Sequence, residues 1–347
     1  MRVGARLGLV ASVAAVVLGA VETASAMPRS CLPGALGVHR EIAIDAKGGP
    51  RYGHQQYPGP EILEAREVVL TFDDGPHKLY TKPILDVLDT YCTKATFFMV
   101  GQRALSYPDL AREVARRGHT IGTHTWSHRD LAKPTSDQAR AEVELGISAG
   151  QRVVGAHAAP FFRFPYLSDG RAMTAHLQAR DTAIFSIDVD SYDFKTRSPS
   201  KMIANVVRQL ESKGRGILLF HDIQPSTALG LSDLLFELKA RGYRVVHVVP
   251  RQPQVTVAEY DRRIDRDHGG GRIAAGPIPV AQRGVVSQNW DVRVGGASSE
   301  VRASPLTPAV PVFQPVAATA PPAEAPPAKP TRSRDESDWR KFIFRSW

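Results

Sequence analysis

Two adjacent carboxylates, Asp73 and Asp74, follow an apolar run and precede the turn-forming pair Gly75-Pro76. Residues 67–71 before them have the composition of a strand, in which aspartate is unfavourable. Two neighbouring negative charges also repel each other, while Gly-Pro forces the chain to turn. Taken alone, the stretch is also compatible with a solvated turn. The alternative is a site that needs a cation, either a metal ion or a catalytic proton.

Two histidines, His124 and His128, follow a strand predicted at 119–123. Their spacing would place both imidazoles on one side of a helical turn, within reach of one ion. With Asp74 they would form a three-ligand set with open positions, which is typical of a catalytic metal. Two histidines four residues apart also arise by chance. The carboxylate pair at a matching strand end is what strengthens the prediction of a metal site. A zincin-type peptidase is excluded, because Thr125 occupies the position of its glutamate.

Ionisable side chains also follow three later predicted strands. These are Arg163, then Asp188, Asp190 and Asp193, and finally His221 with Asp222. Each has a structural explanation when taken singly: a surface ion pair for the arginine, turn caps for some of the aspartates, and a packing role for the histidine. Their repeated position at strand ends instead indicates one shared site.

The elements that must position these groups alternate between short apolar runs and amphipathic segments. Strands are predicted at 67–72, 95–100, 119–123, 161–164, 183–188, 216–220 and 244–249, and helices near Pro83 and at 109–117, 136–151, 169–178, 199–212 and 227–241. Such alternation implies a parallel α/β sheet with right-handed crossovers. Seven strands with outer helices predict a barrel related to the TIM barrel, whose chemistry lies at the C-terminal strand ends.

Five motifs in order resemble those of the polysaccharide deacetylase family, carbohydrate esterase family 4, also called the NodB homology domain. They are Thr71–Pro76, His124–His128, Arg163–Tyr166, Asp190–Phe194 and Leu219–His221. The resemblance covers roughly residues 64–250. It implies a distorted (β/α)7 barrel and the removal of acetyl groups from sugar polymers.

The resemblance also implies a role for each motif residue. Asp73 would be the general base with Arg163 as its partner, and His221 the general acid with Asp193 tuning it. The metal ligands would be Asp74, His124 and His128, holding Zn²⁺ or alternatively Co²⁺ or Ni²⁺. Tyr166 would donate its backbone N–H to the oxyanion, and Tyr166, Phe194 and Leu219 would contact substrate. The family usually has Trp where Phe194 stands, which puts substrate preference in question more than activity.

The implied reaction is hydrolysis of the N-acetyl group of N-acetylglucosamine in peptidoglycan or chitin-type chains. An O-acetyl esterase acting on a xylan-type polymer stays open, because the core machinery is shared and specificity depends on loops. A non-catalytic carbohydrate-binding domain is the alternative of a different class. It would normally have lost a ligand or the base, whereas all five motifs here keep their key polar residues.

Three segments flank the predicted catalytic domain, 67–250. Residues 1–26 combine early arginines, an apolar run and Ala24-Ser25-Ala26, which predicts a secretory signal peptide and export to the periplasm or beyond the cell. No later stretch is suited to span a membrane. Residues 27–66 predict an N-terminal arm with one strand near 41–44. Residues 251–347 hold 12 of the 26 prolines and predict a disordered tail.

The 347-residue chain has a formal net charge of +9 at pH 7. Because its basic residues are scattered, nucleic acid is not the expected partner, and an anionic cell envelope is the better candidate, with possible adsorption by the basic tail. Cys31 and Cys92 are the two cysteines. A disulfide that pins the arm to the first helix of the domain and a pair of buried thiols are both compatible with the sequence.

Overall fold

The protein is described from a computed structural model, which covers Cys31 and residues 34–133 and 136–268. The predicted signal peptide and residues 269–347 of the predicted tail lie outside these residues. Within the described part, no helix has both the length and the apolar character needed to cross a membrane.

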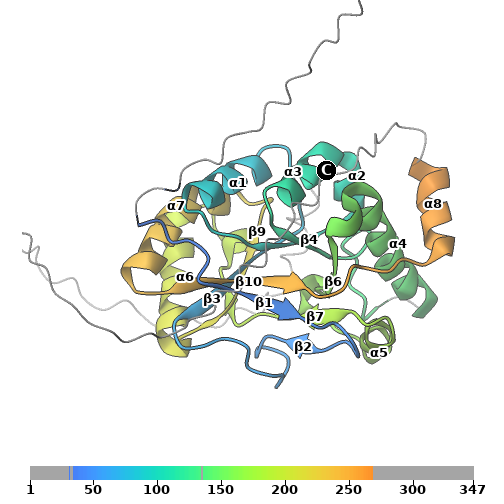
Figure 1. Cartoon of the computed structure of the whole chain (residues 1–347), viewed down its shortest axis with the longest axis horizontal. Helices are drawn as coiled ribbons and strands as arrows, with labels where there is room; N and C mark the ends of the chain where they lie inside the picture. Colours follow the sequence, from blue (N-terminus) through green and yellow to red (C-terminus); the bar gives the residue numbers. More distant parts are fainter. Residues whose placement is uncertain (1–30, 32–33, 134–135, 269–347) are drawn as a thin grey trace, which may run out of the picture. The chain divides into compact units, whose positions relative to one another are not determined.

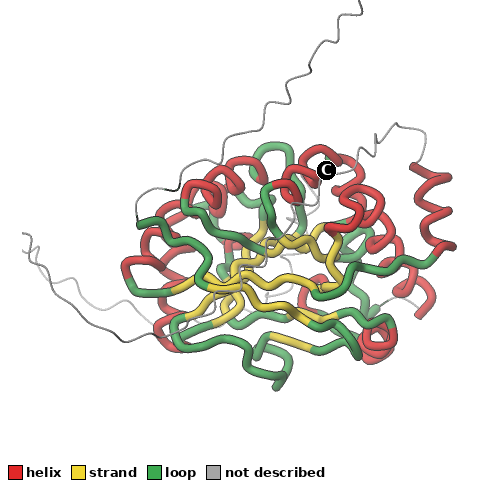
Figure 2. Tube along the Cα trace, viewed as in Figure 1, coloured by secondary structure: helices red, strands yellow, loops and turns green. Residues whose placement is uncertain are grey.

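Strands and helices alternate along the described chain (Figures 1 and 2). The strands are β1 (Arg40–Ile44), β2 (Arg51–Tyr52), β3 (Glu67–Asp73), β4 (Thr96–Met99), β5 (Thr120–Thr123), β6 (Ala158–Phe162), β7 (Ala183–Phe185), β8 (Val189–Asp190), β9 (Gly216–His221) and β10 (Arg244–Pro250). The helices are α1 (Thr81–Thr90), α2 (Gly101–Ser106), α3 (Pro108–Arg116), α4 (Ser136–Val154), α5 (Arg171–Ala179), α6 (Pro199–Lys213), α7 (Pro225–Ala240) and α8 (Ala258–His268), with short 3₁₀ turns η1 (Gly155–His157), η2 (Pro165–Leu167) and η3 (Asp193–Lys195).

All strand pairs in the described sheet are parallel, so their C-terminal ends point the same way. The order is β8-β9-β3-β4-β5-β6-β7-β2, while β10 pairs with the start of β3 and carries β1 on its other edge. The register sets Asp73 opposite His221. The protein therefore has the predicted fold, a distorted (β/α)7 barrel, and two of the predicted site residues share one end of it.

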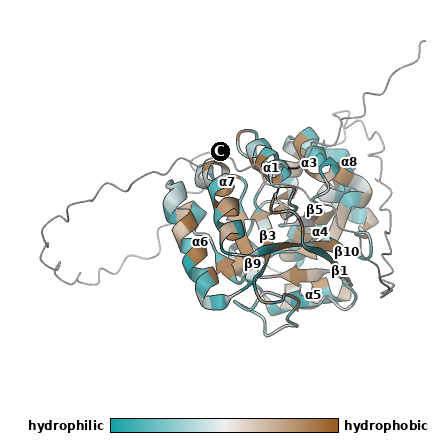
Figure 3. Ribbon diagram, turned by 60° about the vertical axis from the view of Figure 1, so that its left-hand side comes forward, coloured by the Kyte–Doolittle hydropathy of each residue, from teal (hydrophilic) through white to brown (hydrophobic). Residues whose placement is uncertain are grey.

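The two faces of β3 show how the sequence forms this barrel. Leu70 and Phe72 point outward into an apolar cluster shared with the covering helices, where Phe72 stacks on Phe97 at 5.0 Å. Val69 belongs instead to the cluster that fills the barrel interior. Figure 3 shows the outer helices brown toward the sheet and teal on their far side, as amphipathic helices should be. Because strand residues alternate between faces, Asp73 lies on the interior side with Val69.

All seven predicted strands are present, but the one predicted at 183–188 ends at Phe185 as β7, and a separate strand, β8, follows at Val189–Asp190. Asp188 lies at the break. Its N–H donates to the Ile217 carbonyl at 2.8 Å, and its Oδ2 accepts from the Ile217 N–H at 2.7 Å. Its Oδ1 accepts from the backbone N–H of His54 in the arm at 2.7 Å. The Asp188 side chain thus takes a hydrogen bond from β9 that a backbone carbonyl would take in a continuous strand.

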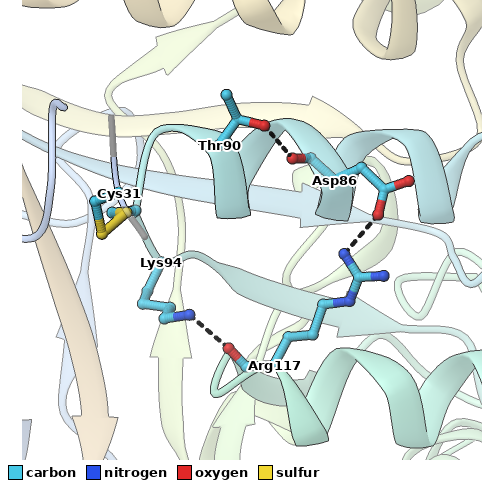
Figure 4. The surroundings of a disulfide bond; sticks show 6 residues. Cys31, Asp86, Thr90, Lys94 and Arg117 are labelled. Atoms are coloured by element: carbon cyan, nitrogen blue, oxygen red, sulfur yellow. Dashed lines mark hydrogen bonds and ion pairs between the residues drawn. A yellow bond between two sulfur atoms is a disulfide. The ribbon is translucent and has the colours of Figure 1, made fainter. Parts of the chain in front are cut away.

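The N-terminal arm packs along the barrel and adds two strands to it. β1 pairs with β10, as the blue and orange arrows of Figure 1 show, and β2 pairs with β7. A disulfide joins Cys31 to Cys92, just after α1, so the disulfide alternative is the correct one. Near it, Lys94 donates to the Arg117 carbonyl and Arg117 pairs with Asp86 of α1 at 2.7 Å (Figure 4).

The prediction of a disordered tail beginning at residue 251 is wrong for its first 18 residues. α8 buries Ile264 against α4, and Asp265 pairs with Arg152 of α4 at 2.7 Å. The Arg180 guanidinium also donates to the Val255 carbonyl at 2.7 Å. One buried isoleucine in a strongly charged segment gives little sequence signal, which is why composition alone missed this helix.

Candidate active site

The floor of the site is a buried ion pair between Asp73 and Arg163. Arg163 is fully buried, and its Nη1 donates to Asp73 Oδ1 at 2.8 Å and to Thr71 Oγ1 at 2.7 Å. Its remaining nitrogens donate to the carbonyls of Phe185 and Ser186, and its charged carbon lies 4.4 Å from the centre of the Phe98 ring. Burial lowers the pKa of Arg163, and the Asp73 carboxylate opposes that effect. The hydrogen bond from Arg163 therefore holds the Asp73 side chain in one orientation.

Asp74 turns away from β3 toward the two predicted histidine ligands. Its left-handed backbone (φ 76°) places its Oδ1 3.1 Å from His128 Nε2 and 3.5 Å from His124 Nε2. The three ligating atoms all lie within 4.8 Å of one another. Within the part of the chain that the structure describes, this is the one group of three such side chains gathered in this way. Burial alone would raise the pKa of Asp74, but the charge and hydrogen bond of His128, together with the charge of His221, lower it.

The predicted helical turn over His124–His128 is wrong, although the spacing does bring the two rings together. The segment is a loop in which Thr125 and His128 are left-handed, with φ of 66° and 60°. Glu142 of α4 is one of its anchors: Ser127 donates from both N and Oγ to the Glu142 carboxylate, at 2.9 and 2.7 Å. A distant partner, invisible in local spacing, holds the loop.

The protonation of His124 tests whether these residues fit a metal ion. Its Nδ1 lies 2.8 Å from the Arg163 carbonyl, which can only accept, so Nδ1 carries the proton. Burial lowers the pKa of His124 to about 4, so Nε2 presents a lone pair toward Asp74 Oδ1. That oxygen is buried, and it also faces His128 Nε2 at 3.1 Å. A lone pair facing a buried carboxylate oxygen is unfavourable unless a cation lies between them, and the residues therefore fit a divalent ion.

The other half of the site is a histidine held in its charged form. Asp193 is fully buried, and its carboxylate accepts from His221 Nδ1 and from the His221 backbone N–H, both at 2.7 Å. Thr227 of α7 donates to the same carboxylate at 2.5 Å. Burial lowers the pKa of His221, but the charge and hydrogen bond of Asp193, with the charges of Asp74 and Asp73, raise it to about 10. His221 can therefore hold a proton above neutral pH.

The three predicted substrate-contacting residues differ in exposure. Tyr166 is left-handed (φ 60°), and its ring meets His128 edge-on at 4.7 Å. Phe194 is 37% exposed and lies edge-on to His221 at 5.5 Å. Leu219 is only 5% exposed. The structure thus places Tyr166 beside His128 and Phe194 beside His221, and the substrate contacts of all three residues stay predictions.

Comparison with known proteins points to one family. The polysaccharide deacetylase family profile matches residues 61–182. A peptidoglycan-N-acetylglucosamine deacetylase of Bacillus cereus is 34% identical over 187 residues, covering 52% of this chain and 66% of the relative. A second from the same organism is 32% identical over 186 residues, covering 52% of this chain and 85% of the relative. The chain belongs to the polysaccharide deacetylase family.

A solved relative agrees with the architecture of this polysaccharide deacetylase domain. The Bdellovibrio bacteriovorus peptidoglycan deacetylase Bd3279 has 37% sequence identity and a TM-score of 0.56, with 62% of this chain and 59% of that chain covered. The family profile ends at residue 182, before Asp193 and His221. The assignment of these two residues therefore depends on the last two motifs and on their geometry.

Sequence reasoning singled out Asp222 but missed that its carboxyl group supports the first motif. Asp222 is buried, and one oxygen accepts from Thr81 Oγ1 at 2.6 Å. A Cβ added to Gly75 would lie 2.0 Å from the same oxygen, so only glycine fits there. Burial raises the pKa of Asp222 to about 7. The signal was present, since Asp222 directly follows His221, but nothing local linked it to Gly75.

Proposed function

We propose that this chain is an exported, metal-dependent deacetylase that hydrolyses the N-acetyl group of N-acetylglucosamine residues in peptidoglycan or chitin-type chains and releases acetate. One observation carries the proposal. The paired ends of β3 and β9 set Asp73 opposite His221, so a fixed carboxylate and a protonated imidazole occupy adjacent strand ends beside the three-residue ligand cluster.

In this proposal Asp74, His124 and His128 hold the divalent ion. The ion would lower the pKa of a water toward neutrality and polarise the acetyl carbonyl. Asp73, kept ionised and oriented by Arg163, accepts the proton of the attacking water. The backbone N–H of Tyr166, turned by the left-handed conformation after β6, donates to the developing oxyanion.

His221 supplies the second proton transfer. A sugar amine is a poor leaving group until its nitrogen is protonated, so cleavage of an amide needs a strong positioned acid. Asp193 favours the charged form of His221, whose pKa lies at about 10. The imidazolium donates its proton to the leaving nitrogen and is recharged from solvent in the next turnover. This requirement favours N-deacetylation over O-acetyl ester hydrolysis.

The names of the relatives support peptidoglycan as the substrate, and chitin-type chains are the alternative that the motifs leave open. Export follows from the predicted signal peptide. Zn²⁺ is the expected ion, because two histidines and one carboxylate with open positions suit it.

The experiment compares acetate release by metal-loaded protein from peptidoglycan fragments, chitooligosaccharides and acetylxylan. Release from the first two, with free amines appearing in equal amount, is the expected result. Release from acetylxylan alone would replace the proposal with an O-acetyl esterase. No release from any of the three would favour a carbohydrate-binding domain.

A further inference from the structure

An exposed loop next to His221 combines two aromatic rings with a cation. Tyr192 and Phe194 are 39% and 37% exposed, and their rings meet edge-on at 6.2 Å. Lys195 Nζ lies 4.4 Å from the centre of the Tyr192 ring and 5.5 Å from that of Phe194. We call Tyr192, Phe194 and Lys195 the rim platform. Exposed aromatic residues beside a catalytic group are more typical of ligand contact than of packing.

The rim platform is held rigidly from behind by α6. Asn205 Nδ2 donates to the carbonyls of Asp190 and Ser191 at 2.8 and 3.0 Å, and Gln209 Nε2 donates to the Asp190 carbonyl at 2.7 Å. Tyr192 is left-handed (φ 51°), its N–H bonds Asp190 Oδ1 at 2.8 Å, and its carbonyl accepts from the Lys195 N–H at 2.9 Å. A loop fixed in this way needs little ordering when it binds a ligand.

Lys195 forms no ion pair within the described chain, although the Asp190 carboxylate of the same loop lies near enough to interact with its charge. Its Nζ contacts the two rings of the rim platform and makes no ion pair with any residue that the structure describes. Two other cations of the site are already paired: Arg163 with Asp73, and His221 with Asp193. The ammonium group is thus available to an anion on a substrate that reaches His221.

We infer that the rim platform selects a glycan strand that carries carboxylate groups: Tyr192 and Phe194 contact the sugar faces, and Lys195 pairs with a carboxylate near the reacting acetamide. This inference rests on the proposed function and narrows it, because peptidoglycan carries lactyl-linked peptide carboxylates and chitin-type chains carry none. The lysine would act mainly on binding and on kcat/KM, since it lies outside the reacting groups.

The test uses metal-loaded full-length protein and two forms of one soluble peptidoglycan fragment, with free and with amidated peptide carboxylates. Lys195→Gln should lower kcat/KM on the free-carboxylate form about fivefold, the worth of an exposed charge pair of about 1 kcal/mol. Turnover of the amidated form should change less than about twofold, and Lys195→Arg should keep the wild-type preference. Lys201→Gln, an exposed lysine on α6, is the matched control. If Lys195→Gln lowered kcat/KM equally on both fragments, or on neither, the inference would be overturned.

Calorimetric titration of the same two fragments separates this inference from the proposed function. Binding of the free-carboxylate fragment that weakens in Lys195→Gln, without turnover in the wild type, would contradict the deacetylase proposal and support the rim platform. Turnover of both fragments at equal rates, with equal affinities in wild type and variant, would keep the deacetylase and contradict the rim platform.

Discussion

The two halves of the site solve opposite electrostatic problems. On the β3–β5 side, a buried carboxylate oxygen and two imidazole nitrogens converge, and burial holds His124 neutral. On the β8–β9 side, the buried Asp193 carboxylate contacts a single imidazole, that of His221, and the imidazole keeps its proton. The first half has the ligand groups for an added cation, as we propose, whereas the second carries its own in His221. A buried carboxylate beside a histidine therefore does not by itself distinguish a metal ligand from a general acid. The partner of Nδ1 decides it: a carbonyl for His124 and a carboxylate for His221.

The largest expected effect is on the base that lies between these halves. Asp73→Asn removes the proton acceptor but keeps the shape of the side chain, so turnover should fall by about 10²–10⁴. Metal content, measured by plasma mass spectrometry, should stay at the wild-type level, because Asp73 is not in the ligand cluster. If Asp73→Asn lost both the ion and turnover, Asp73 would be needed for metal binding as well as for proton transfer.

A smaller effect is expected on the proton-donor half alone. Asp193→Asn removes the charge that raises the pKa of His221, and that pKa should fall. A general acid acts only while protonated, so the basic limb of the turnover profile should move to lower pH, and activity above that limb should be lost. The acid limb should stay in place. A pH profile that does not move would contradict the tuning role of Asp193, and His221→Ala with intact turnover per folded molecule would contradict the acid itself.

A further test affects only the metal half. Glu142→Gln weakens the anchor of the histidine loop at Ser127 without touching the ligands. Metal affinity should fall about tenfold, the usual scale for residues that orient ligands, while turnover at saturating metal changes little. Glu144→Gln, on the same helix but paired with Arg180, should leave the affinity unchanged. Equal losses in the two variants would show a general effect on α4.

The smallest effect on the chemistry is expected far from both halves. Cys31→Ser with Cys92→Ser removes the bond that ties the arm to the end of α1. A cross-link closing a loop of this size is worth about 2–4 kcal/mol of stability. Thermal unfolding should begin at lower temperature, with turnover at 25 °C preserved. A loss of turnover at 25 °C in folded protein would mean that the arm helps to position the site.

The sequence was sufficient for the parts of the site that depend on strand order. Strand ends marked by Asp73, His124, Arg163 and His221 had to meet, because parallel strands share one end. It was insufficient where a contact joins distant segments through a side chain. Three such contacts leave no periodic signal in the sequence: those of Glu142 with Ser127, Asp222 with Gly75, and Asp188 with Ile217.

Secondary structure shows the same division. The helices predicted at 136–151 and 199–212 are present as α4 and α6, and α6 buries Met202, Val206, Val207 and Leu210 at helical spacing. The loop over His124–His128 was predicted as a helical turn, since spacing alone cannot report left-handed residues at Thr125 and His128. α8 was missed because one buried residue, Ile264, anchors it.

The most direct test of the account is acetate release by metal-free and metal-restored protein. The wild type would be stripped with a chelator, checked by plasma mass spectrometry, and titrated with Zn²⁺ on a soluble N-acetylglucosamine oligosaccharide. Activity should vanish on stripping and return in proportion to bound metal, saturating at one ion per chain, and His128→Ala should lose both together. Full activity in verified metal-free protein would contradict the assignment of Asp74, His124 and His128 as a catalytic metal site.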